Sequence, residues 1–187
     1  MDTGKIRLLG ISGSLRAASL NTALLKAAQQ LAPEDVNIIL YTDLGNLPFF
    51  NPDLEGNEPA SVLSFYTLLK SVDGLLIASP EYAHGVTGVM KNALDWVVSG
   101  EEFVGKPVVL FNTSPRASHA YAALKETIMV MSARIVDEAS ITVALLGTKL
   151  DADGIVAHPE ISRALQQSLI AFTHAIRFPL VATQAGD

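Results

Sequence analysis

Residues 10–21 read Gly-Ile-Ser-Gly-Ser-Leu-Arg-Ala-Ala-Ser-Leu-Asn, and the rest of the chain is arranged around this loop. It completes the apolar run 6–11, which predicts a strand, and it leads into a helical pattern that begins near Ser19. The first amide N–H groups of a helix lack partners within the helix and carry a partial positive charge. Serine hydroxyls, the Arg16 guanidinium and the Asn21 amide add donors that suit phosphate oxygens. We therefore interpret the stretch as a phosphate-binding loop.

Two common phosphate-binding motifs do not match this loop. No Gly-Lys-Ser or Gly-Lys-Thr sequence occurs in the chain, so a P-loop is excluded. The dinucleotide fingerprint needs a third glycine for close helix packing, whereas the loop has only Gly10 and Gly13. A serine-rich loop with few glycines suits a terminal monophosphate. The alternative is an ordinary strand-to-helix turn in which Ser19 is simply the helix N-cap.

The composition predicts one folded domain over residues 1–187. Hydrophobic residues make up 49% of the chain and charged residues 17%, which is typical of a globular protein rather than a disordered one. The net charge of -6 argues against nucleic acid or an anionic membrane as the main partner. There is no cysteine, so disulfides and thiolate chemistry are excluded, and no histidine or carboxylate spacing predicts a metal site. Without a signal peptide or a membrane-length apolar run, we expect a soluble cytoplasmic protein with a flexible tail after about residue 179.

Strand-like and helix-like segments alternate along the chain, which predicts a doubly wound α/β fold with a parallel sheet covered on both faces. In such sheets, ligands bind at the carboxyl ends of the strands. We therefore expect the loops after the first, third and fourth strands to form the site. The strands are expected at 6–11, 36–40, 74–79, 108–111 and 140–146, and the helices from 19, from 59, over 87–98, around 124–131 and from 158, with an irregular connection over 42–58 and a turn at 151–154.

The loop after the third strand carries a second motif. Residues 79–96 read Ser-Pro-Glu-Tyr-Ala-His-Gly-Val-Thr-Gly-Val-Met-Lys-Asn-Ala-Leu-Asp-Trp. Together with residues 10–21, this sequence resembles the NADPH-dependent FMN reductases of flavodoxin-like fold, a group that includes quinone, chromate and azo-dye reductases. The similarity runs through Leu-Pro-Phe-Phe-Asn at 47–51 and on to Ser114.

The resemblance implies a five-stranded sheet of order 2-1-3-4-5 and FMN as the bound monophosphate. It places one group of residues on the phosphate loop, a second group along the isoalloxazine ring, and Ser114 near the flavin. The phosphate-loop group is Ser12, Ser14, Leu15, Arg16, Ser19, Leu20 and Asn21, and the ring group is Pro80, Glu81, Tyr82, Ala83, His84 and Gly85.

The chain departs from the family pattern at three places. Ala83 stands where an asparagine is frequent, and Thr87 stands where a proline often opens the helix. Residues 117–119, Ala-Ser-His, replace a glycine pair that often follows the fourth strand. The first two changes leave the phosphate loop intact, whereas the third alters the far rim of the flavin pocket.

Elementary chemistry assigns roles to the second motif as well. Backbone N–H groups over residues 81–85 are candidate donors to the flavin edge where charge develops on reduction. Gly85 and Gly88 are candidates for a sharp turn or a close backbone approach. Tyr82 either forms one wall of the slot for the flavin ring, or it packs in the core or against a partner subunit. His84 is either a proton donor or a residue with a structural hydrogen bond.

Other residues of this motif have structural interpretations. Lys91 and Asp95 are spaced for an ion pair on the helix surface. Glu81 is expected at a helix terminus or a subunit contact. Trp96 is expected in the core or at a dimer surface.

These features predict an NAD(P)H-dependent FMN reductase in which no catalytic side chain is required beyond FMN. Hydride passes from NADPH or NADH to the flavin, and a small-molecule acceptor then takes two electrons in a ping-pong scheme. Quinones, azo compounds, metal oxyanions and free flavin are the candidate acceptors, and Arg116 is the candidate for the extra phosphate of NADPH. The resemblance also implies a homodimer or homotetramer. The alternatives are a flavodoxin-type electron carrier and a flavin-free α/β domain.

Overall fold

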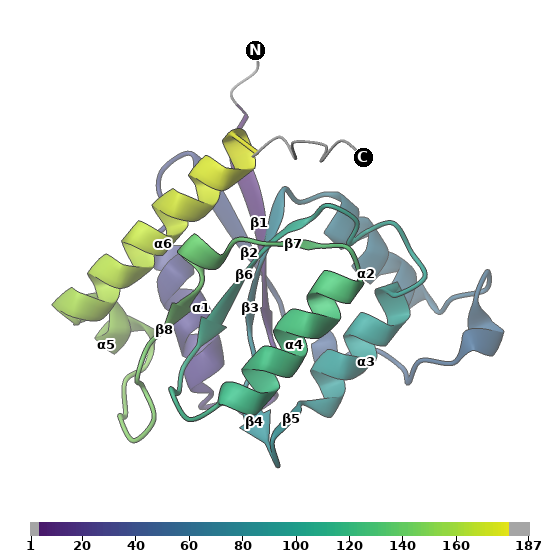
Figure 1. Ribbon diagram of the computed structural model, residues 1–187, viewed down its shortest axis with the longest axis horizontal. Helices are drawn as coiled ribbons and strands as arrows, with labels where there is room; N and C mark the ends of the chain where they lie inside the picture. The colour runs from purple at the N-terminus through teal and green to yellow at the C-terminus, as the bar shows by residue number, and fades with distance from the viewer. Residues whose placement is uncertain (1–3, 180–187) are drawn as a thin grey trace, which may run out of the picture.

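The computed structural model describes residues 4–179, in which strands and helices alternate around one central sheet (Figure 1). The expected flexible tail falls on residues 180–187, outside the described residues. The strands are β1 (Ile6–Ser12), β2 (Val36–Tyr41), β3 (Gly74–Ala78), β4 (Glu81–Tyr82), β5 (Gly85–Val86), β6 (Pro107–Asn112), β7 (Arg134–Ile135) and β8 (Ile141–Thr142). The α-helices are α1 (Leu20–Gln30), α2 (Ala60–Lys70), α3 (Gly88–Val97), α4 (Ser118–Val130), α5 (Ala152–Ala157) and α6 (Pro159–Arg177).

The main sheet is parallel and has the order β2-β1-β3-β6, with β7 and β8 both pairing to β6 at the far edge. This arrangement confirms the predicted flavodoxin-like order 2-1-3-4-5. Helices α1, α5 and α6 lie on one side of the sheet, and α2, α3 and α4 lie on the other (Figure 1). The carboxyl ends of β1, β3 and β6 therefore meet at one edge, next to the small β4–β5 hairpin.

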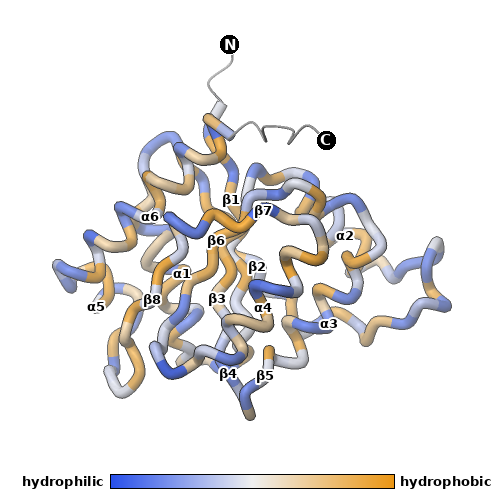
Figure 2. Tube along the Cα trace, in the orientation of Figure 1, coloured by the Kyte–Doolittle hydropathy of each residue, from blue (hydrophilic) through white to orange (hydrophobic). Residues whose placement is uncertain are grey.

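Two hydrophobic clusters, one on each face of the sheet, form the core. Along β1, Leu9 and Ile11 pack into the cluster with α2, α3 and α4, whereas Ile6 and Leu8 pack into the cluster with α1 and α6. This alternation follows from the two-residue period of a strand. Every residue of β3 is buried, which is why its sequence is a continuous apolar run, and Figure 2 shows hydrophobic residues concentrated along the central strands.

The structure corrects two of the expected elements. Of the strand expected at 140–146, only Ile141–Thr142 (β8) is a strand; the edge position next to β6 is shared with β7, which lies earlier in the chain, and a 3-10 helix at Asp137–Ala139 separates the two. Ser140 explains the break, because its hydroxyl accepts a hydrogen bond from the Leu110 N–H of β6 at 3.1 Å, where a backbone carbonyl of a continuous strand would otherwise bind. The turn expected at 151–154 is the start of α5, because the Asp151 carboxylate caps that helix by accepting from the Gly154 N–H at 2.9 Å.

Two side chains of α3 hold the long connection after β2 in place. The Asn92 amide accepts from the Phe50 N–H at 2.9 Å and donates to the Pro48 carbonyl at 2.9 Å. The Trp96 indole N–H donates to the same carbonyl at 2.7 Å, and its ring is buried, as expected for a core residue. The second sequence motif therefore anchors the segment around Phe49, whose own side chain is 90% exposed.

Candidate functional site

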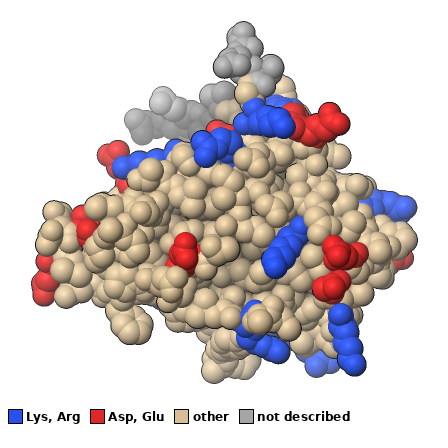
Figure 3. Space-filling model, turned by 180° about the vertical axis from the view of Figure 1, so that it is seen from behind, with Lys and Arg blue, Asp and Glu red and all other residues tan. Residues whose placement is uncertain are grey.

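A cavity of about 960 Å³ opens at the carboxyl edge of the sheet. Its volume lies within the range of about 300–1,000 Å³ that is usual for small-molecule sites. The walls come from the loops after β1, β3 and β6, from one face of α1, and from the segment between β8 and α5. Figure 3 shows Lys and Arg side chains along both the upper and the lower edge of the surface, and the lower edge is the one at which the β4–β5 hairpin lies in Figure 1.

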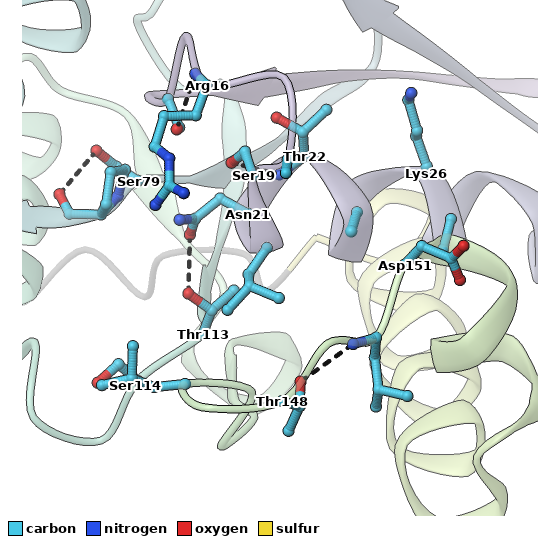
Figure 4. A pocket seen from close by; sticks show the side chains of 18 of the residues that line it. Arg16, Ser19, Asn21, Thr22, Lys26, Ser79, Thr113, Ser114, Thr148 and Asp151 are labelled. Carbon is cyan, nitrogen blue, oxygen red and sulfur yellow. Dashed lines mark hydrogen bonds between the residues drawn. The ribbon is translucent and has the colours of Figure 1, made fainter.

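The loop after β1 presents a helix N-terminus and the Arg16 guanidinium to this cavity. Ser19 is the N-cap of α1, and its hydroxyl accepts from the Thr22 N–H at 3.2 Å. Ser14, Arg16 and Asn21 line the cavity on either side of this cap. The Arg16 guanidinium forms no ion pair with any residue between 4 and 179, and Figure 4 shows it beside the Asn21 amide. These groups are donors, as a phosphate site requires.

Close packing fixes the shape of this loop. A Cβ at Gly13 would lie 2.3 Å from the Ser79 Oγ and 2.8 Å from its Cβ, so only glycine fits where the first loop passes the end of β3. The Ser12 hydroxyl lies 2.8 Å from that of Thr22 and accepts from the Ser14 N–H at 3.3 Å. The Thr113 hydroxyl donates to the Asn21 side-chain oxygen at 3.3 Å, which ties the loop after β6 to α1 (Figure 4).

The segment along which the ring was expected forms a tight hairpin. Strands β4 and β5 are joined by Ala83 and His84, whose φ angles of 48° and 61° are both left-handed. Tight two-residue hairpin turns require this geometry, although asparagine and glycine usually supply it. The sharp turn predicted at Gly85 or Gly88 therefore lies on two non-glycine residues instead. A Cβ at Gly85 would meet nothing closer than 3.4 Å, and one at Gly88 would meet nothing within 4 Å.

Glu81 connects this hairpin to a helix. Its Oε2 accepts a hydrogen bond from the Ala120 N–H at 2.8 Å, in the first turn of α4, which confirms the expected contact with a helix terminus. Its Oε1 lies 3.4 Å from the His84 Nδ1. The His84 ring packs edge-on against His119, with the ring centroids 4.3 Å apart. This arrangement favours the structural interpretation of His84.

The structure brings ten of the predicted site residues together and leaves five outside the cavity lining. Ser12 is engaged with Thr22, and Leu15 packs over Gly45, where an added Cβ would lie 3.1 Å from its methyl groups. Ala83, His84 and Gly85 occupy the hairpin turn and the strand that follows it. The predicted residues that line the cavity are Ser14, Arg16, Ser19, Leu20, Asn21, Pro80, Glu81, Tyr82, Ser114 and Arg116.

Sequence reasoning missed two parts of the cavity wall. Thr22, Lys26 and Gln30 follow Ser19 along one face of α1, a spacing that the helical period could have revealed. The segment from Leu146 to Asp153 forms the opposite wall. It follows the fifth strand position, so extending the strand-end rule to that position would have included it. Other residues that line the cavity without having been named as site residues are Ala17, Ala18, Ala23, Ser79, Asn112, Thr113 and Ala117.

Two further observations concern the described residues as a whole. From residue 4 to residue 179, no three His, Asp or Glu side chains are grouped so that they could hold a metal ion. No helix within the same limits is long and apolar enough to cross a lipid bilayer.

Comparison with known proteins agrees with this geometry. The family model of NADPH-dependent FMN reductases matches residues 6–145. An NAD(P)H-dependent FMN reductase of Pseudomonas aeruginosa is 32% identical over 178 residues, which cover 92% of this chain and 96% of that protein. A 2-hydroxy-1,4-benzoquinone reductase of a Burkholderia species is 28% identical over 178 residues, covering 92% of this chain and 97% of that protein. The structure of FerB, a flavoenzyme NAD(P)H:(acceptor) oxidoreductase from Paracoccus denitrificans, superimposes with a TM-score of 0.73 at 28% identity, covering 92% of this chain and 97% of that one.

A flavodoxin-like sheet with a phosphate-type loop at its carboxyl edge defines a class of flavin-binding proteins. Within that class, the chain belongs to the NADPH-dependent FMN reductase family. The predicted family and the predicted oxidoreductase class, with FMN as cofactor and NAD(P)H as donor, are thereby confirmed at the level of the family.

Proposed function

We propose that the protein is an NAD(P)H-dependent FMN reductase that holds the FMN phosphate in the loop from Ser14 to Asn21. One observation carries this proposal: the N-terminus of α1, the Arg16 guanidinium and the Asn21 amide all line one end of the same cavity. Each is a hydrogen-bond donor, and between Ser14 and Asn21 the residues that line the cavity include no carboxylate. The donor set therefore fits a phosphate dianion.

The remaining walls suit the other parts of the cofactor. Pro80 and Tyr82 supply flat apolar surface next to the loop, and Tyr82 is 55% exposed. Ser114 lines the cavity just after β6, and its hydroxyl accepts from the Arg116 N–H at 3.2 Å. When bound, FMN supplies hydride and electron transfer between donor and acceptor. The chain positions the two partners and excludes water.

Arg116 is the residue we assign to the extra phosphate of NADPH. It lines the cavity near Ser114 and makes no ion pair with a described residue. A guanidinium that no carboxylate engages can bind phosphate oxygens with two parallel hydrogen bonds. NADH lacks that phosphate, so the contribution of Arg116 would appear only with NADPH.

The acceptors we propose are quinones first, followed by azo compounds, metal oxyanions and free flavin. The Burkholderia relative is named for a benzoquinone, which supports the first class. Donor and acceptor would use the same cavity in turn, because Tyr82 and Arg116 both line it. This shared cavity supports a ping-pong scheme.

Anaerobic mixing of FMN-loaded protein with NADPH, and separately with NADH, tests the proposal. We expect the visible flavin band to bleach within seconds and to return when a benzoquinone is added. Steady-state rates with both substrates varied should give parallel reciprocal plots. A band that persists with both donors would identify a flavodoxin-type carrier instead, and protein that never takes up FMN would exclude both functions.

We also propose that the chain forms a homodimer or homotetramer. Phe49 is 90% exposed and Val130 is 73% exposed, which is unusual for apolar side chains of this size. The apolar clusters at 96–98 and 129–131 are each divided, because Trp96 and Met131 are buried while Val98 and Met129 are exposed. Light scattering during gel filtration should show an oligomer, and Phe49→Ser should shift it toward the monomer. A monomeric wild-type protein at assay concentrations would contradict this assignment.

A further inference from the structure

Buried polar side chains are concentrated at the candidate site. Within residues 4–179, four of the buried polar residues line the cavity, namely Ser19, Asn21, Asn112 and Thr113. A polar group is buried at a cost in free energy unless it forms hydrogen bonds, so each of them calls for a partner. Ser19 caps α1, Thr113 donates to Asn21, and Asn21 is assigned to the flavin phosphate. Asn112 is the one whose role is still open.

The Asn112 amide has one engaged end and one open end. Its Oδ1 accepts from the Ser114 N–H at 3.0 Å, and this contact fixes which end of the amide carries the oxygen. Its Nδ2 donates to no residue between 4 and 179, yet it is not among the buried side-chain atoms that lack a partner. This nitrogen is therefore accessible. Because the side chain is only 6% exposed and lines the cavity, the cavity is the place from which a ligand can reach it.

Ser79 lies next to Asn112 on the same face of the sheet. Ile77 of β3 and Leu110 of β6 are partners in the strand register, and both pack into the cluster with α2, α3 and α4. Side chains two residues apart in a strand point to the same face. Continuing both strands by two residues therefore places Ser79 beside Asn112, and both residues line the cavity.

This pair offers one donor and one acceptor. The Asn112 amide nitrogen donates, whereas the Ser79 hydroxyl uses its proton on the Pro80 carbonyl at 3.4 Å and keeps its lone pairs for a ligand. A phosphate oxygen could use only the donor. An alcohol can use both groups, because its oxygen accepts from the amide and its proton goes to the serine.

The pair adjoins the phosphate loop on both sides. Ser79 packs against Gly13, where a Cβ would lie 2.3 Å from its Oγ. Thr113, the residue after Asn112, donates to Asn21 at 3.3 Å (Figure 4). The residues assigned to the flavin ring come later in the same two loops. The pair is therefore placed for the part of FMN that follows the phosphate, which is the ribityl chain with its hydroxyl groups.

We propose that Asn112 is a specificity-determining residue that recognises the ribityl chain. Its amide N–H group donates to a ribityl hydroxyl, and the Ser79 hydroxyl accepts from the same group. This inference rests on the proposed function, because it requires the flavin phosphate to occupy the loop from Ser14 to Asn21. A site that hydrogen-bonds a ligand hydroxyl discriminates against an analogue that lacks it, since the buried donor is then left unpaired.

The test compares FMN with an analogue in which the same ring and phosphate are joined by a plain five-carbon chain. Flavin-free full-length protein is titrated with each compound, and binding is followed by the quenching of flavin fluorescence. We expect the wild-type protein to prefer FMN by about tenfold or more. Asn112→Leu and Ser79→Ala should each lower this preference about three- to tenfold. Ser79→Ala leaves the Asn112–Ser114 contact intact, so it tests the pair even if Asn112→Leu does not fold.

Thr113→Val is the matched comparison, because it removes the neighbouring contact with Asn21. Asn21 serves the phosphate that both compounds carry, so this variant should weaken both equally and leave the preference unchanged. Equal affinities of the wild-type protein for FMN and the analogue, or an unchanged preference in Ser79→Ala and in folded Asn112→Leu, would overturn the ribityl contact and leave the proposed function intact.

Two other results separate the remaining interpretations. If Asn112→Leu weakens both compounds equally and also shifts the reduction potential of bound FMN, the amide faces the flavin ring and the inference is wrong. If the wild-type protein binds neither compound, the proposed function itself is wrong.

Discussion

The Glu81 carboxylate accepts a hydrogen bond from the Ala120 N–H at 2.8 Å and so joins the β4–β5 hairpin to the first turn of α4. The two segments belong to different loops at the carboxyl edge of the sheet, and Glu81 and Ala117 line the same cavity. A negative charge near a helix N-terminus is favourable, and this one also satisfies a free N–H group. The contact therefore fixes the hairpin relative to the loop after β6.

Replacing Glu81 should destabilise the protein in two distinguishable steps. Glu81→Ala removes both the acceptor and the charge and should cost about 1–2 kcal/mol of unfolding free energy. Glu81→Gln keeps an acceptor and should cost about 0.3–1 kcal/mol, the electrostatic part alone. Urea unfolding measures both, with Glu126→Ala, an exposed residue within α4, as the control. Equal losses in Glu81→Ala and Glu126→Ala would show that the capping contact contributes nothing.

Gly13→Ala should distort the loop next to the proposed phosphate site. The new methyl group would overlap Ser79, whose Cβ cannot move away by rotating its side chain, so we expect a loss of about 1–3 kcal/mol of stability. FMN affinity should fall as well, measured by fluorescence titration. Gly88→Ala is the matched control, because a Cβ there meets nothing within 4 Å. Adding Ser79→Gly to Gly13→Ala should restore part of the stability; strictly additive losses would place the strain elsewhere.

Arg16→Ala should weaken FMN binding by about 1.5–3 kcal/mol, the usual contribution of a charge-assisted hydrogen bond. The side chain has no ion-pair partner within residues 4–179, so its removal should leave folding stability nearly unchanged. Calorimetric titration with FMN measures the effect, and Arg163→Ala on the exposed face of α6 is the control. Unchanged affinity for FMN would assign Arg16 to another ligand.

Ala83→Asn should stabilise the hairpin. Alanine at a φ of 48° is strained by the contact of its Cβ with the backbone, whereas asparagine tolerates this region, so we expect a gain of about 0.5–1 kcal/mol. Ala122→Asn is the matched control, because on the exposed face of α4 the same change should cost a few tenths of a kcal/mol. Thermal unfolding compares the two variants. A lower melting temperature for Ala83→Asn would contradict the left-handed turn.

Two of the four tyrosines should ionise late in an alkaline titration. Burial raises the pKa of Tyr41 to about 12 and that of Tyr66 to about 12. The Tyr66 hydroxyl also donates to the Trp96 carbonyl. A folded pKa above the unfolded value of about 10 means that this stability is fully present below about pH 10 and is lost as the pH rises toward 12.

Tyr66→Phe and Tyr41→Phe should therefore each flatten the fall in unfolding free energy between about pH 10 and pH 12. The measured quantity is the slope of the unfolding free energy against pH. Loss of the Tyr66 hydrogen bond lowers the unfolding free energy at neutral pH as well, so it does not by itself change this slope. Absorbance of tyrosinate in the folded protein checks the ionisation directly. Identical slopes in the wild type and both variants would contradict the raised pKa values.

The parts of the fold that sequence patterns predicted are those with strong local signals. Ser19 at the start of α1 and the wholly apolar β3 needed no tertiary information. The fifth strand was misplaced because the break depends on the Ser140 hydroxyl replacing a backbone group of the sheet, a contact between segments 30 residues apart. The same limit applies to α5, whose cap at Asp151 was interpreted as a turn.

The residues of the candidate site also divide into those that the local sequence predicted and those that it did not. Arg16 and Asn21 were predicted because their loop carries its own chemistry, and Glu81 because its neighbours form a recognisable motif. Lys26 and Lys149 lie in ordinary amphipathic and loop sequence, and only the fold brings them to one cavity. The left-handed Ala83 and His84 were missed because neither is a glycine, the residue that signals such a turn.

The divided strand at the edge of the sheet has a consequence for the behaviour of the protein in solution. β7 and β8 are two residues each, and Asp137–Ala139 turns away between them. A foreign chain that tried to extend the sheet there would find only short, separated stretches of backbone and could not form a continuous ladder. The interruption thus guards this edge against intermolecular strand pairing, the first step toward aggregation.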